Sequence, residues 1–261
     1  MNAIAHTTPS AVHTGALQIR GLSKAYRLKG QTLQVLQGID LDIRPGEFVS
    51  ILGASGCGKS TLLRLIVGLD ADYQGQILLD GQPVRGPGLE RGIVFQDHRL
   101  FPWMTLEQNI ALALKNHPLP AGEKQRLVDE HIALVGLRGF EQAYPHQLSG
   151  GMAQRAAIAR ALVNKPKVLL LDEPLGALDA LTRVRLQQEL QRIRARERCT
   201  VVMVTHDIEE ALYLGDRVIV MDAHPGRVRE DLAIGLAHPR DRGSPVLQQC
   251  KQRLLEQLVG H

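Results

Sequence analysis

The sequence predicts an α/β protein with a mostly parallel sheet flanked by helices. Hydrophobic residues make up 44% of the 261 residues and aromatic residues only 3%, so Leu, Val, Ile and Ala must fill the interior. Short runs of these residues at 168–171 and 201–205 are typical of strands buried on both faces. A long charged helix is expected between them at about 180–197, and this strand–helix–strand order favours parallel pairing.

The length of the chain favours one core with an inserted subdomain over two independent domains. We expect a flexible tail at 1–16 and one domain at 17–222, which includes a helical subdomain at about 98–152. A C-terminal turn and helix are expected at 223–261.

The domain is predicted to begin with an antiparallel β subdomain, because residues 17–20 and 36–43 alternate apolar with polar side chains. Residues 48–52 are typical of a buried strand, and a helix is expected from Lys59 to about Val67, ended by Gly68. Further short strands are expected at 77–79 and 93–95, with a turn at Asp80–Gly81.

Helical patterns dominate the subdomain that follows. Thr105 and Gln108 predict a capping box ahead of apolar positions at Ile110 and Leu114, and a second helix is expected at 124–135. Later in the chain we expect a helix after Ser149, a turn at 224–227, and a last helix that begins at 244–245 with apolar positions at Val246, Leu247, Cys250, Leu254 and Leu258.

Composition and charge narrow the classes of protein to which the chain could belong. The net charge of +4 is modest and the arginines are spread along helices, so nucleic-acid binding is not required. Three widely separated cysteines predict reduced thiols and a cytosolic compartment. No stretch approaches the roughly 20 apolar residues of a membrane span, and residues 1–16 lack the pattern of a secretory signal, so we expect neither export nor membrane insertion.

A glycine-rich loop between a predicted strand and a predicted helix indicates a nucleotide site. Its backbone N–H groups can converge on phosphate oxygens, and the following helix directs its positive end at them. Lys59 would reach the β- and γ-phosphates of ATP, and the Ser60 hydroxyl would ligate Mg²⁺. An ordinary turn is the alternative, which the placement disfavours. The predicted nucleotide-binding residues here are Gly53, Ala54, Ser55, Gly56, Cys57, Gly58, Lys59, Ser60 and Thr61.

Two carboxylates end the apolar run at 168–171. A carboxylate is costly there unless it meets a cation, so Asp172 is predicted to hold Mg²⁺ through water, with helix capping as the alternative. Glu173 would orient or deprotonate the attacking water. Gln96 and His206 also follow predicted strands: Gln96 could reach the metal or the water, and His206 the γ-phosphate, although either could be structural.

The segment Leu148, Ser149, Gly150 and Gly151 opens a predicted helix. Its Ser hydroxyl and free N–H groups would form a second anion site, which one chain cannot easily fold onto its own glycine loop. An ordinary N-cap with a Gly-Gly turn is the alternative.

Together these residues resemble the ATP-binding cassette (ABC) family over about 17–222, which implies the P-loop NTPase fold of ABC ATPases. The matching motifs are the phosphate loop (53–60), the glutamine loop (Gln96), the signature (148–151), the acidic strand end (172–173), the Leu178–Asp179 turn and the switch histidine (His206). Tyr26 falls where the family stacks an aromatic ring on adenine. Met152 departs from the pattern, which usually continues with Gln, but the Ser and Gly donors remain.

The resemblance implies a head-to-tail homodimer in which each ATP lies between one subunit's glycine loop and the other's Ser149 segment. Because nucleotides sandwiched between two subunits stabilise only the closed dimer, loss of the γ-phosphate by hydrolysis would reverse closure and drive a membrane partner. The implied partners are two permease subunits and, indirectly, a periplasmic solute-binding protein, at the cytoplasmic face of the bacterial inner membrane. In the transporter branch the region after Gln96 contacts the permease, so Phe101, Trp103 and Met104 are expected to form a partly exposed dock; a role in the core is the alternative.

Three segments, at 95–103, 172–179 and 224–228, resemble the nitrate, sulfonate and taurine importer group. Aliphatic sulfonate import is the nearest match, with nitrate or taurine as alternatives. A soluble ABC ATPase that acts on nucleic acid or ribosomes is a rival, but it would carry a coiled-coil insertion or a second cassette. A metabolite kinase would leave residues 148–151 unexplained.

Overall fold

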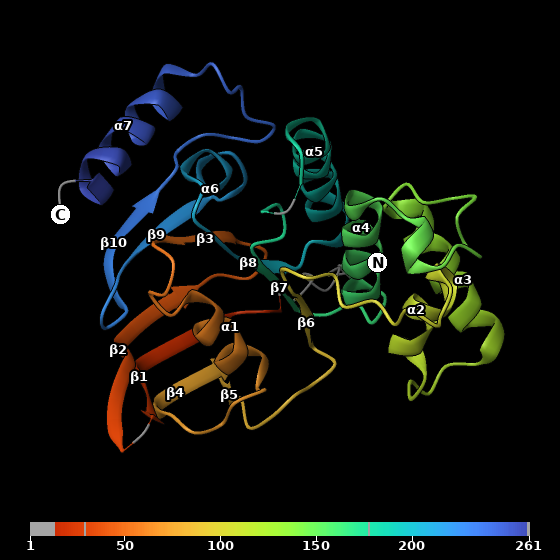
Figure 1. The fold of residues 1–261 in the computed structure, drawn as a ribbon, viewed down its shortest axis with the longest axis horizontal. Helices are drawn as coiled ribbons and strands as arrows, with labels where there is room; N and C mark the ends of the chain where they lie inside the picture. The colour runs from red at the N-terminus through yellow and green to blue at the C-terminus, as the bar shows by residue number, and fades with distance from the viewer. Residues whose placement is uncertain (1–13, 29, 177, 260–261) are drawn as a thin grey trace, which may run out of the picture.

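The computed structural model describes residues 14–28, 30–176 and 178–259, so the predicted tail at 1–16 lies almost entirely outside it. Two β-sheets and α1 form one side of the molecule, α6 and α7 lie beside them, and a group of helices projects from the other side (Figure 1). Among the described helices, none combines the length and the apolar character needed to cross a bilayer.

The larger sheet has the strand order β10-β9-β3-β8-β7-β6. β9, β3, β8, β7 and β6 run parallel, and β10 closes one edge antiparallel to β9. Leu169 and Leu171 face one hydrophobic cluster while Val168 and Leu170 face another, so both surfaces of the sheet are buried as the apolar sequence requires. The bounds are β3 Phe48–Gly53, β6 Arg91–Val94, β7 Val168–Asp172, β8 Thr200–Thr205, β9 Arg217–Asp222 and β10 Arg227–Ala233.

The smaller sheet is antiparallel, as the sequence predicts, with the order β2-β1-β4-β5. Its apolar face packs with α1 (Lys59–Val67) against one surface of the parallel sheet. Its strands are longer than predicted, since β1 and β2 continue into a hairpin beyond the alternating segments. The bounds are β1 Leu17–Leu28, β2 Gln31–Ile43, β4 Gln74–Leu79 and β5 Gln82–Pro83.

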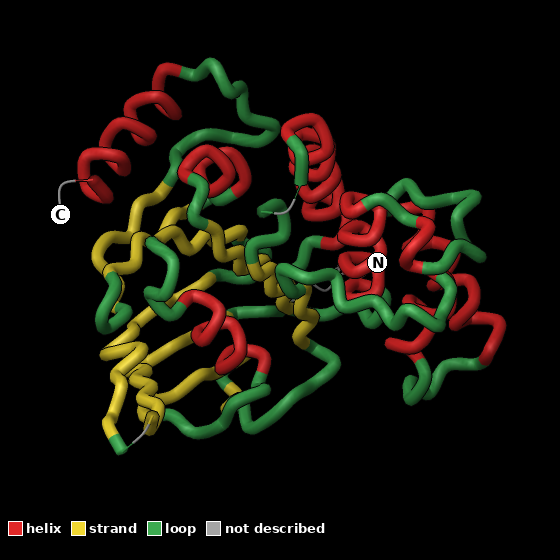
Figure 2. Tube along the Cα trace, in the orientation of Figure 1, coloured by secondary structure: helices red, strands yellow, loops and turns green. Residues whose placement is uncertain are grey.

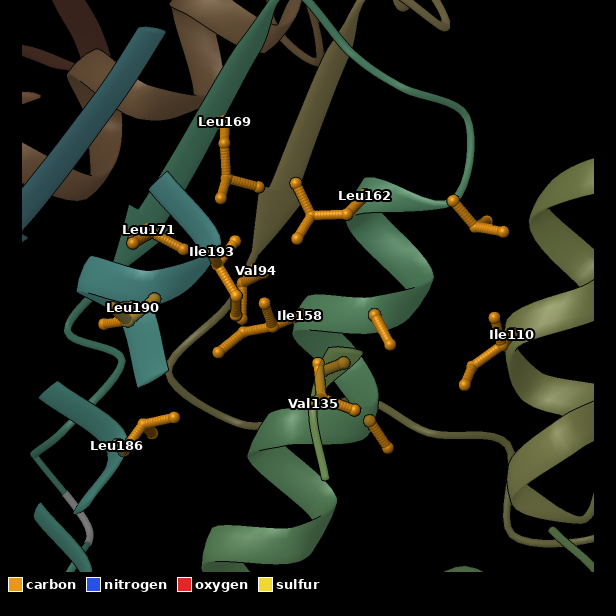
Figure 3. Close-up of a cluster of buried hydrophobic side chains, with 14 of the residues drawn as sticks. Val94, Ile110, Val135, Ile158, Leu162, Leu169, Leu171, Leu186, Leu190 and Ile193 are labelled. Atoms are coloured by element: carbon orange, nitrogen blue, oxygen red, sulfur yellow. The ribbon is translucent and has the colours of Figure 1, made fainter. Parts of the chain in front are cut away.

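Helix α4 (Gly150–Leu162) lies between the opposite surface of the parallel sheet and the rest of the helical group (Figure 1). Ile158 and Leu162 of α4 lie among side chains from β7, α5 (Ala180–Glu197) and α2 (Figure 3). Figure 2 shows this concentration of helix beside the strands. The remaining bounds are α2 Leu106–Ala111, η1 Leu112–Leu114, α3 Ala121–Leu134, η2 Pro145–Gln147, α6 Ile208–Leu214 and α7 Pro245–Val259.

Most predicted elements are confirmed, and three elements near the C-terminus were missed. Helix α1 ends at Gly68 in the left-handed conformation, and Thr105 and Gln108 form both hydrogen bonds of a capping box. The sequence did not predict α6, β9 or β10. The seven-residue α6 and the mostly polar β10 give weak periodic patterns, and β10 gains its order from pairing with β9. For β9, the buried apolar run at 218–221 was the available signal.

Candidate functional site

The carboxyl ends of neighbouring parallel strands bring the predicted site residues to one edge of the sheet. β8 lies between β3 and β7, with Leu52 opposite Thr205 and Asp172 opposite Val204. The glycine loop therefore begins beside the residues that follow β7 and β8, which is where open parallel sheets place their ligands.

The backbone of the loop requires glycine at two positions. Gly56 and Gly58 have φ values of 82° and 95°, in the left-handed region that disfavours other residues. A side chain at Gly58 would also lie 2.6 Å from Leu36 Cδ2 of β2. Gly58 is the N-cap of α1 and makes no side-chain capping hydrogen bond, so the N–H groups of the first turn are not capped by a side chain. The positive end of the helix therefore faces the loop.

Lys59 closes the loop on itself. Its side chain is only 5% exposed, and Nζ donates to the carbonyls of Gly53 at 2.8 Å and Ala54 at 3.0 Å. Cys57 Sγ lies 3.9 Å from the same ammonium, but burial raises the pKa of this thiol and keeps it protonated. The loop therefore presents one desolvated cation, surrounded by oxygen atoms, to an incoming polyphosphate.

Ser60 and Asp172 come together as the sequence predicts. Ser60 Oγ donates to Asp172 Oδ1 at 2.8 Å. Burial raises the pKa of Asp172 above its usual value, and the bond from Ser60 opposes that rise. A partly desolvated carboxylate beside a hydroxyl offers the hard oxygen donors that Mg²⁺ prefers. The third predicted metal ligand, Gln96, donates to Glu173 at 3.5 Å. The described residues contain no cluster of three or more His, Cys, Asp or Glu suited to a metal.

Glu173 contacts two other predicted catalytic residues, His206 and Gln96, whereas Lys59, the fourth, bonds within the glycine loop. Its Oε2 lies 3.2 Å from His206 Nδ1 and 3.5 Å from Gln96 Nε2, so three elements converge on one carboxylate oxygen. Glu173 also has a φ of 43°, and such strained backbone often accompanies functional sites. The arrangement leaves a carboxylate that can accept a proton next to an imidazole and an amide that can bind phosphate or water.

Ser149 does not reach the glycine loop of the same chain. It caps α4, and its Oγ accepts a hydrogen bond from the Met152 N–H at 3.3 Å. Ser149 and Gly151 border a cavity of about 350 Å³, and its other walls include Thr182 of α5. None of residues 53–61 lines this cavity. The two predicted anion-binding segments, 53–61 and 149–151, are therefore separate in one chain.

Tyr26 lies in the antiparallel sheet, on β1. Its hydroxyl donates to Asp70 Oδ2 at 3.2 Å, and Lys24 Nζ lies 4.7 Å from the ring centroid. Tyr26 also borders a cavity of about 650 Å³ together with Tyr73. Stacking on adenine stays a prediction.

The aromatic residues after Gln96 lie at the surface. Trp103 is 68% exposed and Phe101 37%, with ring centroids 5.4 Å apart, so these two side chains are not core residues. Met104 is half-buried. Asn109, which the sequence did not single out, is fully buried and donates to the carbonyls of Phe101 and Met104 at 3.2 and 3.1 Å. The sequence could have indicated Asn109, because it is a polar residue within an apolar helical stripe.

The fold, with a glycine loop between β3 and α1 at the carboxyl edge of a parallel sheet, is that of a phosphate-loop ATPase. The family described as "ABC transporter" matches residues 36–176, and the chain belongs to this family. It binds ATP and is an ATPase coupled to transport.

Two relatives and one solved structure show which members of the family the chain resembles. The chain is 49% identical, over 93% of its length and 94% of the relative's, to the aliphatic sulfonates import ATP-binding protein SsuB of Bacillus subtilis (strain 168). It is also 49% identical to the bicarbonate transport ATP-binding protein CmpC of Synechococcus elongatus, over 86% of this chain and 34% of that protein. A solved dimer of the ATP-binding cassette MJ0796, in a post-hydrolysis state bound to ADP and Pi, has a TM-score of 0.75 and 33% identity, and the match covers 85% of this chain and 100% of that one.

Proposed function

We propose that this chain energises the import of aliphatic sulfonates through a membrane permease. The observation that carries the proposal is the similarity to SsuB, which extends over 94% of that relative. The bicarbonate relative is equally identical, but the match covers only 34% of it. Nitrate and taurine are the alternative cargoes.

A genetic test can separate these cargoes. The gene would be deleted in its native host and restored either as the wild type or as Glu173→Gln. We expect growth on an unsubstituted alkanesulfonate such as ethanesulfonate, as the only sulfur source, to need the wild-type gene, with uptake of nitrate and taurine unaffected. Normal growth of the deletion strain on the alkanesulfonate, with loss of nitrate or taurine uptake, would favour the alternatives.

At the site, the proposal gives each residue a role. Lys59 and the N–H groups of residues 53–61 bind the phosphates, and Glu173 accepts the proton of the attacking water. His206 and Gln96, both next to Glu173, hold the γ-phosphate and the water. Ser60 and Asp172 hold Mg²⁺, which supplies charge neutralisation for the phosphates when bound.

The active form would be a homodimer with two composite sites. The separation of the Ser149 cavity from the glycine loop in one chain supports this proposal, and so does the dimeric state of the MJ0796 cassette. The second anion-binding segment of each site then comes from the partner subunit, together with Gly150 and Gly151.

The exposed aromatic residues would form the permease dock, at the cytoplasmic face of the inner membrane. Exposed aromatic side chains are enriched at protein interfaces, and Phe101 and Trp103 stand side by side at the surface. Copurification tests the dock: Trp103→Ala should lose the permease subunits while ATP binding is kept. Intact permease binding by this variant would contradict the assignment. Nucleic acid that copurifies with the protein and is released by salt would favour a soluble ATPase.

A further inference from the structure

Arg160, in the last turn of α4, holds the backbone that follows Gln96. Its Nη2 donates to the carbonyl of His98 at 2.9 Å and its Nη1 to the carbonyl of Arg99 at 2.8 Å. Burial lowers the pKa of Arg160, and none of the described carboxylates forms an ion pair with it. A rigid, planar guanidinium bonded to two consecutive carbonyls fixes both the position and the direction of that backbone.

The segment that Arg160 holds joins two functional places. We call residues 96–103 the connecting segment. It begins at Gln96, beside Glu173, and ends at the exposed rings of Phe101 and Trp103. The far end is fixed separately, because the Phe101 N–H donates to Asn109 Oδ1 at 2.7 Å. Arg160 is therefore the anchor of the middle of the connecting segment.

The middle of the segment is strained. Arg99 has a φ of 48°, a conformation that costs a residue other than glycine on the order of 1 kcal/mol. Its guanidinium lies 3.8 Å from the centroid of the Phe95 ring, and the Phe95 carbonyl accepts a bond from Gln154 of α4 at 3.4 Å. Strained backbone persists only where surrounding contacts hold it, and the two bonds from Arg160 are such contacts.

We propose that Arg160 is a positioning residue that makes the connecting segment move as one body. A displacement of Gln96 at the nucleotide then reaches Trp103 at the surface. Without Arg160, rotation of the backbone at His98 and Arg99 would absorb the movement. This inference rests on the proposed function, because it supplies the link between the ATP site and the dock.

The chain contains a single tryptophan, Trp103, which serves as the probe. The full-length Glu173→Gln protein would be titrated with Mg-ATP while the emission of Trp103 is recorded, and ATP affinity would be measured separately by equilibrium dialysis. We expect ATP to shift the emission. Adding Arg160→Met should reduce the shift at least fivefold while the Kd for ATP changes less than twofold. Arg160→Lys, which keeps the charge but not the paired donors, should retain an intermediate shift.

Asn164→Ala is the matched control. Asn164 lies just beyond α4 and donates to the carbonyl of Ala113 at 3.1 Å, outside the connecting segment, so this variant should keep the full shift. A full shift in Arg160→Met, no shift in the parent protein, or loss of the shift together with ATP affinity would each overturn the inference. Should Arg160→Met not fold, Arg160→Lys decides: a full shift contradicts the inference, and a reduced one supports it. No cargo takes part, so an error in the sulfonate assignment leaves this test unaffected.

Discussion

At the scale of single residues, Glu173 carries the clearest chemical prediction. Its carboxylate contacts both His206 and Gln96 and does not belong to the phosphate loop, so a change at Glu173 leaves the phosphate-binding residues in place. Glu173→Gln keeps the shape and removes the base, so hydrolysis should fall by about 10²–10⁴-fold with ATP affinity kept. Phosphate release and nucleotide binding measured on the same sample check this. Turnover near the wild-type rate would remove Glu173 from the catalytic role.

Lys59 should act on binding rather than on the chemical step alone. Its ammonium is buried and bonded only to neutral groups of the loop, so a polyphosphate gains a charge-assisted hydrogen bond that water cannot replace. Lys59→Ala should weaken ATP binding by at least tenfold, as measured by equilibrium dialysis. Unchanged affinity would mean that the phosphates bind elsewhere.

The identities of these residues were readable from the sequence, but their pairings were not. The glycine loop is contiguous, and Asp172, Glu173 and His206 each end an apolar strand, so position in the sequence was enough to find them. That Gln96 bonds to Glu173, and Ser60 to Asp172, depends on side-chain geometry between separate strands. Arg160 gave no local signal, because its partners lie about 60 residues earlier in the chain.

At the scale of elements, Asp216, just before β9, bonds to residues of three other segments: Phe48 of β3, Arg194 of α5 and His238. Burial alone would raise its pKa, but bonds from His238 and from the Phe48 N–H, together with the charge of Arg194, lower it from 3.8 to about 2. A lowered carboxyl pKa stabilises the fold fully above pH 4, and this stabilisation is lost as the pH falls toward 2.

Asp216→Asn should therefore lower the free energy of unfolding by about 1–2 kcal/mol at pH 7. The difference from the wild type should shrink near pH 3, since the wild-type carboxyl then gives up part of its advantage. Urea unfolding at both pH values checks this, with the exposed Asp129→Asn as control. A difference that does not depend on pH would contradict the electrostatic explanation.

The packing of α4 gives a second prediction at this scale. Ile158 is fully buried between β7, α5 and the helical group (Figure 3). Ile158→Ala should cost about 2–5 kcal/mol of unfolding free energy, because it removes buried apolar atoms and leaves a cavity. Leu255→Ala on α7, where the side chain is 41% exposed, should change it by less than about 0.5 kcal/mol. Circular dichroism during urea unfolding measures both, and equal losses would contradict the burial argument.

Helices with strong ends were predictable, whereas short elements held by distant partners were not. Gly68 and the Thr105–Gln108 pair mark their helix ends locally. Helix α6 is capped by Asp207, whose side chain accepts a bond from the Glu210 N–H, yet the helix has only seven residues and no full periodic pattern. β10 is mostly polar and lacks a regular apolar pattern, so its order comes from pairing with β9.

At the scale of the whole molecule, the separated anion-binding segments predict assembly with nucleotide. Glu173→Gln with Mg-ATP should double in molar mass by light scattering, because slow hydrolysis preserves the closed dimer. Adding Ser149→Arg should keep the protein monomeric while ATP still binds, since Ser149 would complete the partner's site. A Ser149→Arg protein that still dimerises, or one that cannot bind ATP, would contradict a site shared between subunits.

The order of strands in the parallel sheet also bears on how the protein is made. β3, which leads into the phosphate loop, lies between β8 and β9, and both are encoded more than 140 residues later. While the ribosome is still translating, the loop strand emerges early and stays an unpaired edge until Asp222 has left the exit tunnel. Fragments truncated before β9 leave one side of β3 unpaired, so they should aggregate rather than bind ATP.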